Sequence, residues 1–139
     1  MGDHHDGLLT EIDHIGIAVR DLDAAIGFYT GLFGAELVQR ERIESDGVDE
    51  ALISIADSYV QLVCPFREDS PAAKFIAKRG EGVHHVGYRV ESCAEVLKQA
   101  QEMGYETVDK VPRPGSRNTT VAFIHPKAAF GTLIELVEE

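Results

Sequence analysis

Two stretches of the chain share one pattern of apolar and polar positions. The segment EIDHIGIAVRDLDAAIGFYTGLFG in the first half resembles GVHHVGYRVESCAEVLKQAQEMG in the second. Four pairs of residues correspond at one constant spacing: His14 with His85, Gly16 with Gly87, Val19 with Val90, and Asp21 with Ser92. Self-similarity at a fixed offset indicates a duplicated structural unit, and chance explains it poorly.

Each copy starts with an apolar, partly alternating segment that predicts a strand, at residues 12–19 and 83–90. Asp21 and Ser92 are suited to cap the helices that follow, and Gly34 and Gly104 to end them. The apolar face of the first helix is predicted to contain Leu22, Ala25, Ile26, Tyr29 and Phe33, and that of the second Val96, Leu97, Ala100 and Met103.

Three segments rich in β-branched residues follow each helix. They are residues 37–43, 51–55 and 59–63 in the first copy, and 105–108, 119–124 and 132–137 in the second. A linker helix over residues 70–79 is predicted by Ser70 as its cap, Pro71 at its first position and Gly80 at its end.

The predicted fold class is therefore α+β, with tandem βαβββ modules at about residues 10–64 and 81–139. Half-size modules bury too little apolar surface to be stable alone, so we expect them to pack as one domain over residues 10–139. Residues 1–9 are predicted to be a disordered tail.

Charge and cysteine content narrow the function classes. With a formal net charge of −11, binding to a nucleic acid backbone or an anionic membrane is disfavoured. Only Arg20, Arg40 and Arg42 among the 13 basic residues precede residue 65, so anionic ligands should approach the second half.

Cys64 and Cys93 match no metal spacing and suit a reducing compartment. The N-terminus resembles no secretion signal, and we expect a cytoplasmic protein.

Equivalent positions of the duplicated strands hold candidate metal ligands. The segments YVQLV and LIELV pair Gln61 with Glu135, each a polar residue between apolar ones. With His14 and His85 they form a mixed nitrogen and oxygen set suited to cobalt, manganese, nickel, zinc or iron. Taken singly, each histidine could be a hydrogen-bonded core residue and Gln61 a strand-edge residue.

The other histidines are weaker candidates. His84 competes with His85, but only His85 is in register with His14. We interpret His4 and His5 as solvated tail residues. His125, which precedes Pro126, is predicted to shape the turn before the last strand.

The strings DHIGIAV, GVDEALI, YVQLV, GEGVHHVGY, VAFIHPK and LIELV resemble methylmalonyl-CoA epimerases of the vicinal oxygen chelate superfamily. The resemblance covers residues 12–137 and implies an open, cup-shaped sheet around one divalent metal, in a homodimer of propionate metabolism. The implied ligands are the same four, His14, Gln61, His85 and Glu135, and the implied catalytic glutamate is Glu50. Cobalt is the first expectation for the metal, with manganese, nickel, zinc or magnesium as alternatives. The chain departs from the family at Asn118, where a second glycine is usual, and in the short stretch between Ile55 and Tyr59.

The implied reaction interconverts (2R)- and (2S)-methylmalonyl-CoA through an enolate. Glu50 is the expected base, and Glu135 the candidate for the opposite face. Lys74 and Lys78 are candidates for the coenzyme A phosphates, and Gly115, Ser116 and Arg117 for the substrate carboxylate. Four alternatives stay open: ethylmalonyl-CoA as substrate, a glyoxalase I-like isomerase, a ring-cleaving dioxygenase, and a non-enzymatic protein that binds a small molecule.

Overall fold

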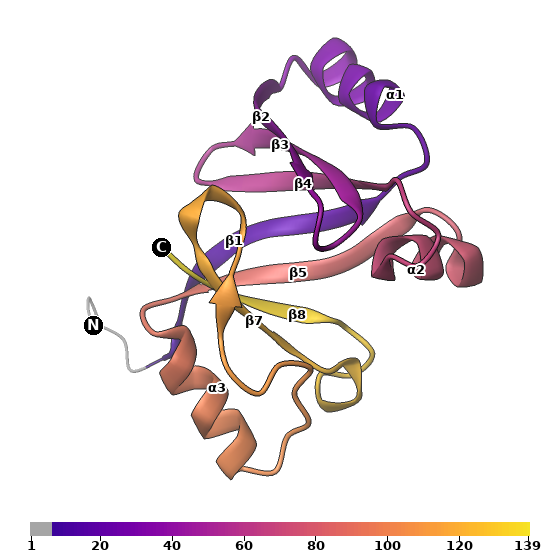
Figure 1. Cartoon of the computed structure of the whole chain (residues 1–139). Helices are drawn as coiled ribbons and strands as arrows, with labels where there is room; N and C mark the ends of the chain where they lie inside the picture. The colour runs from indigo at the N-terminus through magenta and orange to yellow at the C-terminus, as the bar shows by residue number, and fades with distance from the viewer. Residues whose placement is uncertain (1–6) are drawn as a thin grey trace. The chain divides into compact units, whose positions relative to one another are not determined.

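A computed structural model of the chain describes residues 7–139 and contains the repeated order of elements that the sequence predicts (Figure 1). The first copy comprises β1 (Leu9–Ala18), α1 (Leu22–Gly27) with a π-helical turn η1 (Phe28–Leu32), β2 (Glu36–Ile43), β3 (Val48–Ile55) and β4 (Ser58–Pro65). The second comprises β5 (Gly82–Val90), α3 (Cys93–Glu102), β6 (Arg113–Pro114), η2 (Ser116–Asn118), β7 (Thr120–Ile124), η3 (Pro126–Ala128) and β8 (Ile134–Glu138). The linker helix α2 (Pro71–Arg79) joins them. The α+β class with tandem βαβββ modules is confirmed.

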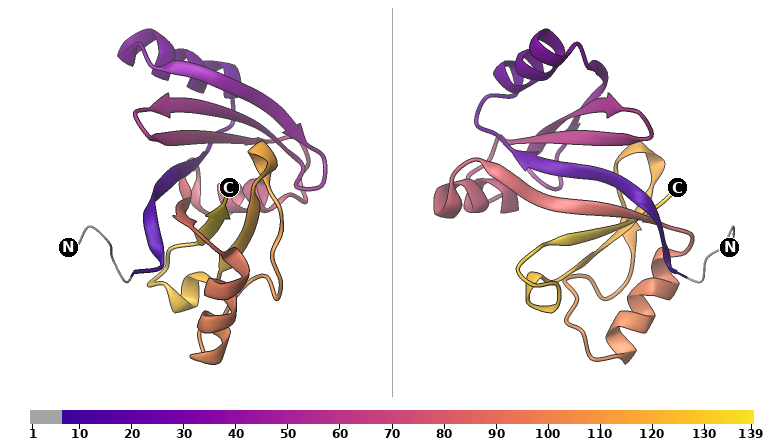
Figure 2. Two further views of the ribbon diagram at one scale, coloured as in Figure 1. Left: turned by 90° about the vertical axis from the view of Figure 1, so that its left-hand side faces the viewer. Right: turned by 180° about the vertical axis from the view of Figure 1, so that it is seen from behind.

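The chain divides into two units, and strands β1 and β5 contribute to both. The first unit is His14–His85, with strand order β2-β3-β4-β1-β5. The second unit is Val86–Glu139 together with the chain up to Asp13, with strand order β1-β5-β8-β7-β6. In each unit the module's first strand runs parallel to its last, β1 beside β4 and β5 beside β8. In each unit one helix covers one face of its strands, α1 in the first and α3 in the second (Figure 2).

The first unit buries the apolar face predicted for its helix, with one exception. Leu22, Ala25, Ile26 and Tyr29 pack against buried strand residues, including Ile53 and Leu62. Phe33 was predicted on this face, but 63% of it is exposed. The π-helical turn is the reason, because its wider turn rotates the following residues away from the core.

In the second unit, Leu97 and Cys93 of α3 pack against Leu136 and Ala122, with Val96 partly buried beside them. The Ser92 side chain caps α3 by accepting a hydrogen bond from the amide of Glu95. Met103, predicted on the buried face, is 69% exposed. It lies beyond the last residue of α3, before Gly104 turns the chain with positive φ.

The predicted strand at residues 105–108 is wrong. Only Thr107 forms a bridge, to Ile124, and its hydroxyl donates to the Asp109 carbonyl, which turns the chain. The Asp109 carboxylate then accepts from the amide of Phe123, a donor that a strand partner would otherwise use. The strand beside β7 is instead the two-residue β6.

The bounds of α2 and β1 can be compared with those predicted. The linker helix is confirmed, with Ser70 as its cap and Gly80 after its end. Strand β1 begins at Leu9, inside the segment predicted as a tail, and His4 and His5 lie outside the described residues. No helix within residues 7–139 is long and apolar enough to cross a membrane.

Candidate metal centre

In the first unit, strand alternation places His14, Gly16, Gln61 and Glu50 on one face. Gly16 lies opposite Gln61 in the parallel pair of β1 and β4, and His14 precedes Gly16 by two residues. Glu50 lies opposite Val63, two residues along β4 from Gln61. The neighbouring residues Val60 and Leu62 face α1 in the hydrophobic core. The predicted alternation of Gln61 with apolar core residues is therefore confirmed.

His14 and His85 converge within the first unit. Both are buried, and their Nε2 atoms lie 3.0 Å apart. Two nitrogen ligands of one divalent ion, each with a bond of about 2.0–2.1 Å, also lie about 3 Å apart. The buried imidazole pair therefore fits a divalent metal ion.

Gly16 makes room for this pair. A Cβ atom at Gly16 would overlap the imidazole ring of His85. The glycine therefore has a steric role at the site, which the sequence analysis used only as a marker of the repeat. The sequence contains a pattern that could have indicated this role, because a glycine follows the histidine by two residues in both copies.

His84 supports His85 from the neighbouring position. The two Nδ1 atoms lie 3.0 Å apart, and the His84 ring packs edge-on against Phe75 of α2, with ring centroids 5.0 Å apart. A partner on the second ring nitrogen orients a ligating histidine and fixes its tautomer. His84 thus fits a supporting role beside His85.

Gln61 and Glu50 form a direct hydrogen bond. The Gln61 side-chain amide donates from Nε2 to Oε1 of Glu50 over 3.0 Å. Because the amide nitrogen serves Glu50, the amide oxygen is the atom that Gln61 can offer to a metal. The same contact holds the carboxylate of Glu50 beside the candidate ligand. Sequence reasoning named both residues but had no signal for this bond.

In the second unit, Glu135 occupies the position that matches Gln61. It lies opposite Gly87 in the parallel pair of β5 and β8, as Gln61 lies opposite Gly16. Its neighbours Ile134 and Leu136 face the core beneath α3. Glu135 is half-buried and offers a carboxylate oxygen as a ligand atom.

The candidates for substrate contact lie on two segments. Lys74 and Lys78 are exposed on α2, where they can reach an anion. Gly115, Ser116 and Arg117 form the turn before β7. The side chain of Arg117 is only 14% exposed and pairs with Asp13, 2.6 Å from Nη2 to Oδ2. The charge of this guanidinium is therefore met within the protein, by Asp13 and by Glu139 at 3.7 Å.

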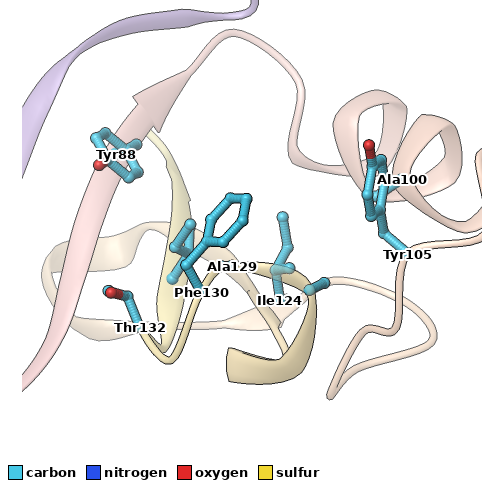
Figure 3. A pocket seen from close by; sticks show the side chains of 9 residues that line it. Tyr88, Ala100, Tyr105, Ile124, Ala129, Phe130 and Thr132 are labelled. Carbon is cyan, nitrogen blue, oxygen red and sulfur yellow. The ribbon is translucent and has the colours of Figure 1, made fainter.

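A pocket of about 380 Å³ in the second unit is distinct from the candidate ligands. Its lining is mainly apolar, and in Figure 3 the Phe130 ring lies between Tyr88 and Tyr105. Ile124 and Ile134 also line it, and both face α3. The pocket therefore opens on the face of β8 opposite to Glu135. His125 shapes the turn beside it by accepting from the amide of Lys127, as predicted.

Comparison with known families identifies the fold. Residues 13–123 match the family model of the Glyoxalase/Bleomycin resistance protein/Dioxygenase superfamily. The chain belongs to this superfamily. The family relation accounts for the tandem βαβββ modules, and members of the superfamily use divalent metals.

Relatives in the superfamily include acyl-CoA epimerases. The chain is 32% identical over 131 residues to the ethylmalonyl-CoA/methylmalonyl-CoA epimerase of Cereibacter sphaeroides, covering 93% of this chain and 98% of the relative. The crystal structure of methylmalonyl-CoA epimerase from Mycobacterium tuberculosis matches with 40% identity and a TM-score of 0.92, covering 96% of this chain and 91% of that one. A methylmalonyl-CoA epimerase in complex with methylmalonyl-CoA and NH4+ matches with 42% identity and a TM-score of 0.90, covering 94% and 95%.

Proposed function

We propose that this protein is a metal-dependent epimerase that interconverts (2R)- and (2S)-methylmalonyl-CoA by transfer of the α-proton. Relatives that match nearly the whole chain carry this activity in their names. The observation that carries the proposal is the hydrogen bond from Gln61 to Glu50, in the unit that also pairs His14 with His85. It sets a proton acceptor beside candidate metal ligands.

His14, Gln61, His85 and Glu135 would hold the ion. Two imidazoles, an amide oxygen and a carboxylate suit cobalt, manganese, nickel or zinc; cobalt is our first choice, and magnesium an alternative. Glu135 is assigned to this set because its register opposite Gly87 repeats that of Gln61 opposite Gly16. A bound divalent ion supplies positive charge near the thioester and carboxylate oxygens and so stabilises an enolate.

Glu50 removes the α-proton from one face of the substrate. Its contact with Gln61 orients the carboxylate, and a positioned general base contributes roughly 10²- to 10⁴-fold to rate. Glu135 is the candidate that returns a proton on the opposite face, although coordination would make its carboxylate a weaker base. Each glutamate would act on one epimer.

The remaining proposed substrate contacts lie on α2 and on the turn before β7. Exposed Lys74 and Lys78 would meet the phosphates of coenzyme A at α2. The turn containing Gly115, Ser116 and Arg117 would lie near the substrate carboxylate.

Ethylmalonyl-CoA is the second acyl group to test, because the relative from Cereibacter sphaeroides is named for both substrates. We place the protein in the cytoplasm as a homodimer that serves propionate metabolism.

Incubation of the metal-loaded protein with methylmalonyl-CoA in D2O tests the proposal. Deuterium should enter the α-position, chelation should abolish the exchange, and added metal should restore it. The matched control for Glu50→Gln is Glu36→Gln, because Glu36 is a strand glutamate of β2 that lies opposite Ser54 and not opposite Glu50. This variant should exchange like the parent. Absence of α-exchange in the metal-loaded parent would contradict the function, and oxygen consumption with a catechol would favour the dioxygenase.

A further inference from the structure

A buried carboxylate in the second unit joins two arginines. The side chain of Asp13 is fully buried. Its Oδ1 accepts from Nε and Nη2 of Arg89, at 3.0 and 2.6 Å. Its Oδ2 accepts from Nη2 of Arg117 at 2.6 Å. Each oxygen thus serves one arginine, and burial strengthens the ion pairs.

The second arginine lies in a strained turn. Arg117 and the following Asn118 both have φ of 58°, a left-handed conformation that is unfavourable for arginine but better tolerated by asparagine. Such strain persists only where surrounding contacts hold it, and it concentrates at functional sites. Three local hydrogen bonds between Gly115, Ser116 and Thr119 close the turn. The contact from Arg117 to Asp13 ties it to β1.

This turn lies over the face of the sheet that carries Glu135. Val121 of β7 is opposite Val137, and Phe123 is opposite Glu135, so their side chains share the face of Glu135. A Cβ atom at Gly115 would lie 2.6 Å from Cγ1 of Val121. The turn therefore starts, at Gly115, against a side chain of the face where the substrate is proposed to bind.

We infer that Asp13 is a positioning residue, which holds Arg117 and thereby fixes the turn of residues 115–119 in the shape that binds the carboxylate end of the acyl-CoA substrate. The inference rests on the proposed function and assigns Arg117 an indirect role. Its guanidinium shares the charge of Asp13 with Arg89, and the carboxylates of Glu139, 3.7 Å from Arg117, and Glu11, 2.9 Å from Arg89, complete the charge balance of the group. The backbone and Ser116 of the turn would then be the groups that meet the substrate.

The variants Asp13→Asn and Arg117→Gln separate this role from direct binding by Arg117. If the turn must be held, both should raise KM for methylmalonyl-CoA about tenfold, with a smaller change in kcat. If Arg117 itself bound the substrate carboxylate, Asp13→Asn would release its charge, and KM would fall or stay unchanged. Arg113→Gln is the matched control, since Arg113 precedes the same turn but pairs with Asp109.

Hydrogen exchange of the peptide covering residues 111–121 provides a readout independent of activity. Amide exchange at Gly115 and Thr119 should be faster in both variants and unchanged in Arg113→Gln, because these amides close the turn. If Asp13→Asn does not fold, Arg117→Gln still tests the role, since it leaves the pair of Asp13 with Arg89.

Faster exchange together with a raised KM supports the inference. Unchanged exchange, or faster exchange with an unchanged KM, overturns it. Metal content should equal that of the parent in all three variants. A parent without α-proton exchange would contradict the proposed function instead, and the hydrogen-exchange result would still decide whether Asp13 holds the turn.

Discussion

The two units have the same strand arrangement but differ in the chemistry that it carries. In both, a glycine lies opposite the polar ligand candidate, Gly16 opposite Gln61 and Gly87 opposite Glu135. The next equivalent position differs: Glu50 lies opposite Val63 in the first unit, whereas Val121 lies opposite Val137 in the second. Duplication therefore accounts for the paired candidate ligands, while the proposed base belongs to one unit only.

The polar ligand candidates also differ between the units. Gln61 has an amide that can donate to Glu50, whereas Glu135 has a carboxylate, which can only accept when ionised. An amide beside the base holds it without adding negative charge. A second carboxylate at that place would repel Glu50.

Loss of one histidine of the converging pair should have the largest effect. His85→Ala should remove the bound metal and abolish turnover, because one of two converging imidazoles is lost. His84→Ala should retain metal with at most a 10- to 100-fold loss of affinity, the range for a partner behind a ligand. Metal content by elemental analysis, at matched protein concentration, measures both. Equal retention by the two variants would contradict the assignment.

Gly16→Ala should have the next largest effect. The added Cβ would collide with the His85 ring, so metal affinity should fall at least about tenfold, as when a ligand's support is lost. The matched control is Gly27→Ala, because no atom lies within 4 Å of a Cβ added there. Titration with cobalt, followed by visible absorption, compares the two. If Gly16→Ala bound cobalt like the control, the ring would not need this space.

Gln61→Glu should have a moderate effect and makes the two units alike. It removes the donor to Glu50 and adds a negative charge beside it, so turnover should fall about tenfold, while a carboxylate still binds metal. The reciprocal Glu135→Gln should weaken metal binding, because it removes the negative ligand, and should lower turnover as well, because it removes the candidate acid–base group. Metal content, measured on both variants, distinguishes the two positions. If Gln61→Glu lost as much metal as Glu135→Gln, the two positions would be interchangeable.

The smallest effect concerns the two cysteines, one in each unit. Burial, together with the charges of Glu138, Glu135 and Asp109, raises the pKa of Cys93 to about 11. Burial also raises the pKa of Cys64, but Cys64 is half-buried, whereas Cys93 is fully buried. Iodoacetamide at pH 8 should therefore label Cys64 faster than Cys93, as read by peptide mass spectrometry. Faster labelling of Cys93 would show that α3 opens readily.

The pKa of Cys93 also predicts an alkaline dependence of stability. Because the folded pKa is raised, the folded state holds this proton more tightly than the unfolded chain, whose cysteine has a pKa of about 8.5. The contribution of Cys93 to stability should thus be complete below about pH 8.5 and decline towards pH 11. Urea unfolding of the parent and of Cys93→Ala across this range measures the contribution.

The sequence predicted those parts of the fold that depend on periodicity. Strand alternation correctly separated Gln61 from Val60 and Leu62, and capping residues correctly bounded α2. Prediction from the sequence failed where a local irregularity interrupts the regular helix or strand. The π-helical turn moved Phe33 out of the core, and the bonds of Asp109 replaced a strand at residues 105–108.

The candidate site was predictable only where it depends on the repeat. Register and duplication pointed to His14, Gln61, His85 and Glu135, because equivalent positions in a repeat are visible in the sequence. Contacts between side chains from distant segments are not visible there. The bond from Gln61 to Glu50 and the position of Asp13 between two arginines are visible only in the three-dimensional structure.

The most direct test of the account is α-proton exchange by Glu50→Gln, measured separately with (2R)- and (2S)-methylmalonyl-CoA in D2O. The variant keeps the shape of the side chain and the four proposed ligands, so metal content should equal that of the parent. Epimerisation should fall roughly 10²-fold or more, with exchange abolished from one epimer and partly retained from the other. Epimerisation at the parent rate would contradict the assignment of Glu50 as the base. Loss of exchange from both epimers, with metal and substrate still bound, would contradict the division of work between two glutamates.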